Sequence, residues 1–563
     1  MGFSRAEALS RLARERFDVV VVGGGITGAG AALDAASRGL RTALVERRDF
    51  ASGTSSKSSK LVHGGLRYLQ QHEYRLVYEA LAERQRLRRT APHLVRLLPF
   101  LLPMFGRDGL VHPRLVKGLS TALWLYDLTG GARIGRLHDR ISTDEVMARM
   151  PTLRRDRVVG GFIYYDAQTD DARLTLTVAR TAADEGAAVA NWCPVVGLLK
   201  NGDGGGRVTG VRVHPVGAPD AFDVTASVVV NATGVWSDVL RTMDEGLRPD
   251  TLRPAKGIHI SVPWAKVRNQ IAAVLPVPGD RRSVFVVPNG DVSYVGTTDT
   301  DYDGPLDDPQ CTPEDVDYLL AALNASLTAP LGREDVVGTW AGLRPLLKSA
   351  DRGRTADLSR RHRISVSDSG VVSVTGGKLT TYRKMAAETV DEVVRAVGRG
   401  GRSGTSRMAL HGARGYAALR ADPEAPSRLS VDAGLLARLA DRHGSDARVI
   451  AAMVGTDRRL GQPLVPPLPY IRAEALHAVR YEMARTLDDV LARRIPARWL
   501  ARDASAAVAE EVARLIAPDL GWTEADIDGE VATYRASVEA ERDAAGLGDH
   551  RDGPSRPLPV AGH

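Results

Sequence analysis

The sequence predicts an α/β fold followed by an all-α domain, and three observations support this. Residues 17–46 have the pattern of a strand, a glycine-rich turn, a helix and a second strand. Residues 371–394 again combine an apolar strand, two glycines and a helix. After residue 408, apolar residues recur every three or four positions, which is the period of amphipathic helices.

The composition is that of an ordinary globular protein. The chain has 563 residues, 44% hydrophobic and 25% charged, enough for several domains. Cys193 and Cys311 lie far apart and outside any CxxC spacing, which fits a reducing compartment and predicts no metal or disulfide framework. No early apolar run has the length of a signal peptide, and no run is long enough to span a bilayer.

The formal net charge of +7 favours anionic substrates or an anionic membrane surface. No nucleic-acid-binding module accompanies it, so nucleic acid is not expected as a partner. The pattern of elements divides the chain into five parts. They are a basic lead (1–16), an α/β block (17–397), a glycine-rich linker (398–408), a helical domain (409–545) and a tail expected to be disordered (546–563).

The α/β block places strand–glycine–helix units at both of its ends. Between them, residues 283–287 and 292–296 flank Asn289-Gly290, the dipeptide typical of a tight β-hairpin. In the helical domain, residues 476–490 give one apolar stripe. The arrangement indicates one binding domain made of separated segments, with a mixed-sheet domain inserted.

The first glycine turn predicts a binding site for an adenine dinucleotide. Gly23 permits the tight turn, Gly25 lets the backbone approach a pyrophosphate, and Gly28 lets the helix pack closely. Glu46 ends the second strand, where a carboxylate can bind ribose hydroxyls and repel the extra phosphate of NADP. The turn alone leaves FAD and NAD open.

Two further segments suit a flavin. Thr54, Ser55 and Ser59 belong to a hydroxyl-rich loop that fits a pyrophosphate, although such a loop is also common on protein surfaces. A helix that follows Gly376 and Gly377 directly would point its positive end at a reduced flavin.

Arginine forks bind phosphate in a bidentate manner, which makes Arg344 and the cluster at 360–363 candidates for an anionic substrate. Taken alone, most of these arginines fit an ordinary surface. His259 flanks a strand, where a lone histidine is more often structural than catalytic.

These motifs together resemble the FAD-dependent glycerol-3-phosphate dehydrogenase family. Residues 22–39 are similar to the first signature of that family, and residues 376–386 are similar to the second. The segments 54–69, 231–236, 296–299 and 342–346 also match. The resemblance covers about residues 17–395, and residues 474–491 resemble the C-terminal domain of the same family.

The resemblance implies a D-amino-acid-oxidase-type FAD-binding fold with an inserted mixed-sheet substrate domain. It implies oxidation of sn-glycerol 3-phosphate to dihydroxyacetone phosphate, with electrons passed from FAD to a membrane quinone. The protein would then be cytoplasmic and attached peripherally to the anionic inner face of the cell membrane. The oligomeric state stays open, with a homodimer as one alternative.

The resemblance also assigns residues. Catalysis would involve His259 as the first choice of base because a neutral imidazole is poised near pH 7, His63 as the second choice, and Lys378. The substrate would be bound by Arg344, Arg360, Arg67 and Tyr68. The cofactor would be bound by Gly23, Gly25, Gly28, Glu46, Thr54, Ser55, Ser59, Gly234, Gly377, Lys378, Leu379 and Thr380. The pattern around Arg360 departs from the family, so Arg360, Arg361 and Arg363 remain alternatives for the phosphate contact.

Two other functions stay open. One is a peroxide-forming oxidase of the same fold, and the other is a non-catalytic flavin-binding regulatory module. Residues 94–125 combine apolar and basic residues and are a candidate membrane-binding patch, although core packing explains them equally well. Covalent attachment of FAD to His63 is also left open.

Overall fold

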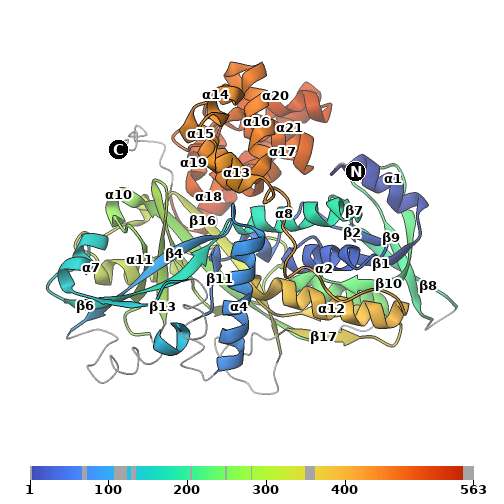
Figure 1. Cartoon of the computed structure of the whole chain (residues 1–563), viewed down its shortest axis with the longest axis horizontal. Helices are drawn as coiled ribbons and strands as arrows, with labels where there is room; N and C mark the ends of the chain where they lie inside the picture. Colours follow the sequence, from blue (N-terminus) through green and yellow to red (C-terminus); the bar gives the residue numbers. More distant parts are fainter. Residues whose placement is uncertain are drawn as a thin grey trace.

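The computed structural model describes residues 3–65, 73–106, 123–127, 135–202, 206–246, 250–280, 282–348 and 362–548. This part of the chain forms two sheets, side by side, and a helical domain that lies against both of them (Figure 1). The architecture confirms the predicted α/β fold with a C-terminal all-α domain.

The first sheet is largely parallel and joins segments from distant parts of the sequence. β1 is buried at all six of its positions, which explains its unbroken apolar character. β1 pairs in parallel with β2 and β10, and β10 pairs in parallel with β18. Along the sheet the order is β17 (Arg363–Val366), β18 (Val372–Thr375), β10 (Phe222–Asn231), β1 (Phe17–Val22), β2 (Thr42–Val45) and β7 (Ala188–Ala190).

Helices cover both faces of this sheet. α2 (Ile26–Ser37), α8 (Asp171–Asp184) and α12 (Tyr382–Val397) share one core with it. On the other face lie α1 (Arg5–Arg14) and the hairpin of β8 (Val195–Lys200) and β9 (Val208–Val213). The helix expected directly after Gly377 begins later, because a 3-10 turn, η6 (Leu379–Thr381), comes before α12.

Within the described part of the chain, the second sheet has ten strands and is mostly antiparallel. The hairpin predicted at Asn289-Gly290 is confirmed, and Gly290 has φ 62°. β16 (Gly338–Leu347) pairs with β11, and β5 (Asp139–Ile141) pairs with β6. The order of the remaining strands is β15 (Thr300–Asp301), β11 (Leu252–Pro263), β14 (Val292–Gly296), β13 (Ser283–Asn289), β12 (Ala272–Pro276), β4 (Arg96–Phe105), β6 (Val158–Gln168) and β3 (Leu61–Val62).

Helices also pack on this second sheet. α7 (Thr143–Arg149) and α11 (Pro313–Ser326) bury apolar residues in one core with it. α4 (Tyr74–Thr90) contributes Val77 and Leu81 to a separate aromatic core. α4 begins at Tyr74, and residues 66–72 lie outside the described part of the chain.

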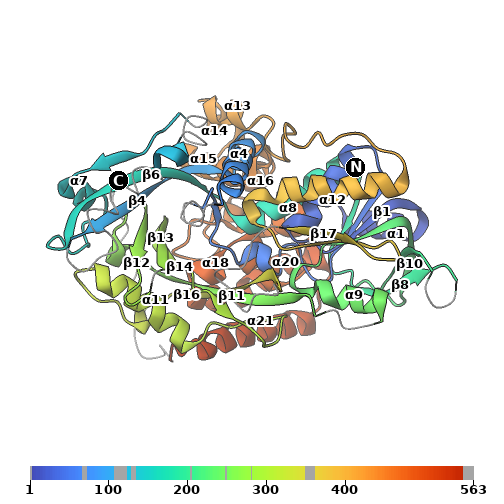
Figure 2. The same ribbon diagram turned by 90° about the horizontal axis from the view of Figure 1, so that it is seen from below.

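The C-terminal helices gather above both sheets in Figure 1, and α21 runs beneath β11 and β16 in Figure 2. The apolar stripe at 476–490 does not form one helix. α17 (Arg472–Glu482) ends within the stripe, Met483 adopts φ 57°, and a π-helical segment, η9 (Asp489–Arg494), follows. The other helices are α13 (Tyr416–Ala421), α14 (Ala425–Leu429), α15 (Ala433–His443), α16 (Ala447–Thr456), α18 (Ala497–Leu500), α19 (Arg502–Ala507), α20 (Ala509–Leu520) and α21 (Glu524–Ala544).

The segment at 398–408, expected to be a flexible linker, has no regular structure but is held to the first sheet's domain. Arg399 pairs with Asp18. The buried carboxylate of Asp34 accepts hydrogen bonds from Ser403 and Thr405. The acidic residue of the first signature therefore anchors the connecting segment rather than facing a ligand.

Candidate functional site

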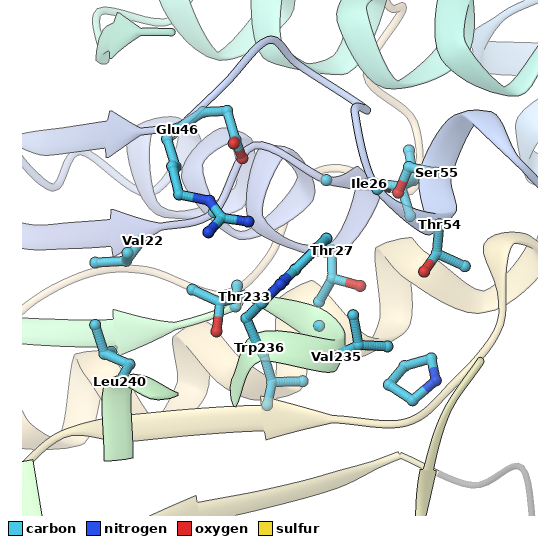
Figure 3. A pocket seen from close by; sticks show the side chains of 18 of the residues that line it. Val22, Ile26, Thr27, Glu46, Thr54, Ser55, Thr233, Val235, Trp236 and Leu240 are labelled. Carbon is cyan, nitrogen blue, oxygen red and sulfur yellow. Dashed lines mark hydrogen bonds between the residues drawn. The ribbon is translucent and has the colours of Figure 1, made fainter. Parts of the chain in front are cut away.

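A pocket lies at the carboxyl ends of the parallel strands (Figure 3). Four residues that line the pocket each follow a parallel strand. Gly23 follows β1 and Glu46 follows β2, while Gly234 comes shortly after β10 and Gly377 shortly after β18. The carboxyl ends of parallel strands are the usual place for a ligand in α/β sheets. The sheet order thus brings together glycines that are hundreds of residues apart in the sequence.

The first glycine turn has no room for side chains. Gly23 has φ 110°, and a Cβ atom on it would lie 2.6 Å from the carbonyl oxygen of Ala232. A Cβ atom on Gly28 would overlap the carbonyl oxygen of Gly23. The turn therefore lies directly against β10, and α2 packs closely onto the turn, as the spacing of the glycines predicts.

The start of α2 forms the anion-binding part of the pocket. Gly25 is the N-cap residue and supplies no side-chain cap. The hydroxyl of Ser55 accepts a hydrogen bond from the amide of Ile26 at 2.9 Å, and Figure 3 shows Ser55 and Thr54 beside this helix end. Backbone amides and the helix dipole favour a phosphate at such a position.

Glu46 is fixed at the other end of the turn. Its carboxylate accepts hydrogen bonds from the amides of Gly24 at 2.5 Å and Arg48 at 2.8 Å. Burial raises the pKa of Glu46 above the usual range of a carboxyl group. A half-buried acceptor in this place suits the hydroxyl groups of a ribose.

The second glycine pair forms the opposite wall. Gly376 and Gly377 have φ 78° and 90°, and a Cβ atom on Gly377 would overlap the sulfur of Met385. Lys378 and Leu379 also line the pocket. Thr380 does not line it, because its side chain is buried and hydrogen-bonds to the backbone of His63, at 3.1 Å to N and 3.2 Å to O.

Pocket-lining residues after β10 were missed by the sequence reasoning, which named only Gly234 there. Trp236, in η3 (Gly234–Trp236), lines the pocket and donates its indole N–H to Asp307 at 2.8 Å. Arg47 lies over the same ring at 5.0 Å. α9 (Ser237–Glu245) adds apolar lining from Val239, Leu240 and Met243. The resemblance at 231–236 was the available signal.

The register of the second sheet gathers the predicted substrate residues on one face. His259 of β11 pairs with Trp340 of β16, and Ala255 pairs with Arg344. Paired residues share a face, and so do residues two apart on one strand. Arg344, Trp340 and His259 therefore project from the same side of the sheet.

The loop at 54–63 lies against this face. Thr54 donates its hydroxyl to the carbonyl of Leu343 at 2.6 Å, and Trp340 donates its indole N–H to the carbonyl of Ser58 at 3.2 Å. The Ser59 hydroxyl is 2.9 Å from Nε2 of His259. The loop predicted to bind the cofactor thus joins the pocket to the candidate substrate residues.

His259 is buried, with 3% of its surface exposed. Burial, reinforced by Arg344 and Lys60, lowers the pKa of His259 well below its ordinary value. The lowered pKa departs from the expectation of an imidazole poised near neutral pH, because burial disfavours the charged form of the ring. A Cβ atom on Gly296 would overlap this ring, so the glycine makes room for it.

Of the remaining candidate substrate residues, some lie in the described part of the chain and others do not. Arg344 is held 3.1 Å from Asp299 and 3.2 Å from the hydroxyl of Thr297. The ring of His63 lies 6.1 Å from that of Phe285, on the same sheet. Arg363 begins β17 and is exposed. The other residues named for this role, Arg67, Tyr68, Arg360 and Arg361, lie outside the described residues.

A buried cluster of His443, His477 and Glu482 lies away from the pocket, with one ligand-type atom of each within 4.8 Å of the others. Arg173 and Arg180 both pair with Glu482. These guanidinium groups already neutralise the carboxylate. We therefore interpret the cluster as an ion-pair network between α8 and the helical domain and not as a metal site.

The pocket fits FAD. The crowded glycine turn and the start of α2 suit the pyrophosphate, Glu46 suits the ribose, and the pair at 376–377 leads to η6 beside the place for the flavin ring. The apolar residues of α9 add a surface for an adenine.

Two family models match the chain. Residues 18–383 match the family described as FAD dependent oxidoreductase. Residues 403–527 match the family described as the C-terminal domain of alpha-glycerophosphate oxidase. The first match contains the pocket and the second sheet, and the second match lies in the helical domain.

Individual proteins agree with the family models. Glycerol-3-phosphate dehydrogenase 2 of Mycobacterium tuberculosis is 44% identical over 543 residues, which are 95% of this chain and 90% of the relative. The mitochondrial glycerol-3-phosphate dehydrogenase of Bos taurus is 37% identical over 94% of this chain and 74% of the relative.

A solved structure supports the same assignment. The glycerol-3-phosphate dehydrogenase of Bacillus halodurans complexed with FAD superposes with a TM-score of 0.76 at 30% identity, covering 96% of this chain and 97% of the other. The cofactor of the present chain is FAD. From the glycine cradle, the two-sheet fold and these similarities, we conclude that the chain belongs to the FAD-dependent glycerol-3-phosphate dehydrogenase family.

Proposed function

We propose that this protein oxidises sn-glycerol 3-phosphate to dihydroxyacetone phosphate and passes the electrons to a membrane quinone. The observation that carries the proposal is the contact between Ser59, on the loop beside the FAD pocket, and His259, on the face that also holds Arg344. A base and a phosphate-binding cation thereby lie on one sheet face next to the cofactor loop. The names of the relatives agree with this substrate.

Arg344 is proposed to bind the substrate phosphate. Its guanidinium group is oriented by Asp299, by the hydroxyl of Thr297 and by the carbonyl of Thr298 at 3.1 Å. A planar fork with several donors matches phosphate oxygens better than an ammonium group does. Arg360 and its neighbours, together with Arg67 and Tyr68, remain proposed phosphate or substrate contacts.

His259 is proposed to take the proton of the C2 hydroxyl. Burial lowers the pKa of His259 and so favours the neutral imidazole, which is the form of the ring that can accept a proton. Nε2 is held by Ser59, and Nδ1 has no hydrogen-bond partner among the described residues. This geometry suits the tautomer that donates from Nε2 and accepts at Nδ1. His63 is the second candidate for the base.

FAD, when bound, supplies the two-electron oxidation at the C2 carbon. The residues proposed to hold it are the glycine turn, Glu46, the hydroxyl loop at 54–59, and residues 376–379. Lys378 lines the pocket and is proposed to stabilise negative charge near the substrate oxygen.

The test is anaerobic reduction of the bound flavin. We expect bleaching of the flavin absorbance by glycerol 3-phosphate and not by glycerol. His259→Asn should slow this reduction by about two to four orders of magnitude. Arg344→Lys should mainly raise the concentration of glycerol 3-phosphate that gives half of the maximal rate of flavin reduction. A yellow protein that glycerol 3-phosphate does not reduce would support a non-catalytic flavin-binding module instead.

The electron acceptor separates the dehydrogenase from the oxidase. One family match carries the description of an alpha-glycerophosphate oxidase domain, so the oxidase is the second candidate. Steady-state turnover with a soluble quinone analogue should exceed turnover with oxygen alone, and little peroxide should form. Stoichiometric peroxide at equal rates would support the oxidase.

Attachment to the inner face of the cell membrane is the proposed route to the quinone. Among the described residues, no helix is long and apolar enough to cross a bilayer. Only part of the candidate patch at 94–125 can be assessed, because residues 107–122 lie outside the described residues. Its β4 part needs correction, since β4 lies inside the second sheet and buries Phe100 and Leu101. Exposed apolar residues lie at the end of the patch, at Trp124 and Leu125, and beyond it at Leu137.

Flotation with anionic and neutral vesicles tests this attachment. We expect binding to anionic vesicles, weakened by salt and by the double substitution Trp124→Ala and Leu137→Ala. The exposed Val216→Ala, from the other domain, serves as the matched control. Equal flotation of all variants would argue against this membrane surface.

A further inference from the structure

Asp49 is a fully buried carboxylate in the loop that connects the two ends of the FAD cradle. It lies three residues after Glu46 and before the hydroxyl loop. Arg494 binds it in a bidentate manner, with Nη1 at 2.6 Å and Nη2 at 2.8 Å. Arg493 donates Nε to the same carboxylate at 2.7 Å, and Asn191 donates its amide at 3.0 Å. One acidic residue of the FAD domain is thus held by two arginines of the helical domain.

The two arginines are themselves held firmly. Both belong to the π-helical segment η9, a rare geometry that is often found at functional sites. Arg493 also binds Asp488 and Asp489. Arg494 donates to the carbonyl of Glu482 at 2.7 Å. The helical domain therefore presents a preformed, rigid pair of cations to Asp49.

The residues beside Asp49 touch the glycine turn. The amide of Ala51 donates to the carbonyl of Gly24 at 3.1 Å. Phe50 packs so closely on Gly24 that a Cβ atom there would lie 2.9 Å from the ring. The amide of Gly24 in turn donates to Glu46. Movement of Asp49 would therefore be transmitted to the glycine turn and to the ribose-binding carboxylate.

No described residue after Leu379 lines the FAD pocket, so the helical domain does not reach the dinucleotide in this part of the chain. We propose that Arg493 and Arg494 are positioning residues for FAD: by holding Asp49, the C-terminal helical domain fixes the loop at 46–55 in its FAD-binding shape. Cofactor affinity in this protein then depends on the docked state of a domain whose described residues do not line the FAD pocket.

The physical reason is the cost of an unpaired buried charge. Removing one partner from a buried ion pair leaves the other charge uncompensated, so the loop must move to rehydrate it. Because Phe50 and Ala51 are packed on Gly24, such a movement alters the cradle itself. An ion pair elsewhere in the same domain interface should lack this consequence.

The test compares Arg494→Gln with His411→Gln. His411 of the helical domain pairs with Asp184 of α8 at 2.7 Å, at a part of the same interface that lies away from Asp49 and the two arginines. Both variants weaken the same domain interface. FAD release is followed by flavin fluorescence after dilution, FAD affinity by titration of the apoprotein, and domain stability by thermal unfolding of the apoprotein.

We expect Arg494→Gln to weaken FAD binding by about tenfold or more, while His411→Gln binds FAD as the wild type does. Wild-type FAD binding in Arg494→Gln would overturn the proposal. Equal weakening in both variants would also overturn it, because general loosening of the interface would then suffice. If Arg494→Gln does not fold, Arg494→Lys is measured by the same criterion, since it keeps the charge but loses the bidentate contact.

Discussion

The imidazole of His259 lies parallel to the indole of Trp340, with ring centroids 4.8 Å apart and planes 7° apart. Trp340 is fixed by its hydrogen bond to Ser58 and stacks on Trp499 of the helical domain at 5.7 Å. The stack orients the proposed base and excludes water from it, which contributes to its low pKa.

Replacing Trp340 by Leu should expose His259 to water and raise its pKa towards the ordinary value. Activity should then fall on the acidic side, giving kcat/KM a new limb near about pH 6.5 that the wild type lacks. The measurement is the pH profile of kcat/KM, with the exposed Trp124→Leu as control. An unchanged profile would mean that the stack does not set the protonation of His259.

Replacing Gly28 by Ala should abolish FAD binding, because its Cβ atom would overlap the carbonyl oxygen of Gly23. We expect the purified variant to retain less than about a tenth of the wild-type flavin. Gly529→Ala is the control, because Gly529 has open space around its Cβ position on α21. Normal flavin content in Gly28→Ala would contradict the steric argument.

Replacing Glu46 by Gln should raise the Kd for FAD by about tenfold, or ~1.4 kcal/mol. A neutral amide has one acceptor oxygen and cannot serve both the Gly24 and Arg48 amides as well as a ribose hydroxyl. Titration of the apoprotein with FAD measures the effect. The exposed Glu185→Gln should leave the Kd unchanged.

Replacing Arg344 by Lys should lower kcat/KM for glycerol 3-phosphate by about 10- to 100-fold, mainly through KM. Flavin content should stay normal, since Arg344 does not line the FAD pocket. The control is Arg253→Lys, on the same sheet, where the arginine pairs with the exposed Asp301. A KM like that of the wild type would remove Arg344 from the phosphate site.

His411 should make stability depend on alkaline pH. Its ring lies 2.7 Å from Asp184 and 3.1 Å from Asp446, with Arg180 nearby, and although burial opposes the charge, the two carboxylates raise its pKa from 6.5 to about 9. Because the pKa of His411 is raised in the folded state, the protonated ring stabilises the fold. This stabilisation is fully present below about pH 6.5 and is lost as the pH rises through about 9.

The loss amounts to about 3 kcal/mol at most, since each pKa unit corresponds to about 1.4 kcal/mol. Thermal unfolding at about pH 6 and pH 9.5 should therefore show a smaller decrease in Tm for His411→Gln than for the wild type. Equal decreases would show that other groups govern alkaline stability.

Much of the FAD cradle is contained in short stretches of sequence. Gly23, Gly25, Gly28 and Glu46 lie within a single βαβ unit, where each position has a steric or hydrogen-bonding requirement that follows from spacing alone. The hairpin at Asn289-Gly290 was predictable for the same reason, because the dipeptide itself favours the turn.

The sequence was less informative where contacts between distant segments determine the local structure or the lining of the pocket. The apolar stripe at 476–490 keeps a helical period, yet Met483 leaves the helix and a π-helical segment follows. Periodicity records which residues are buried, and burial in this core does not require one continuous helix. Trp236 was missed because a tryptophan after a strand carries no local sign of lining a pocket.

By itself, then, the sequence determined the dinucleotide cradle, the two-domain order and the family resemblance, since these depend on contiguous residues. Only the tertiary structure decided that Ser59 meets His259, 200 positions away, and that Asp49 meets Arg494, 445 positions away. It also decided the protonation of His259. Strand register, domain docking and exclusion of water set these properties, and they arise only when distant segments pack together.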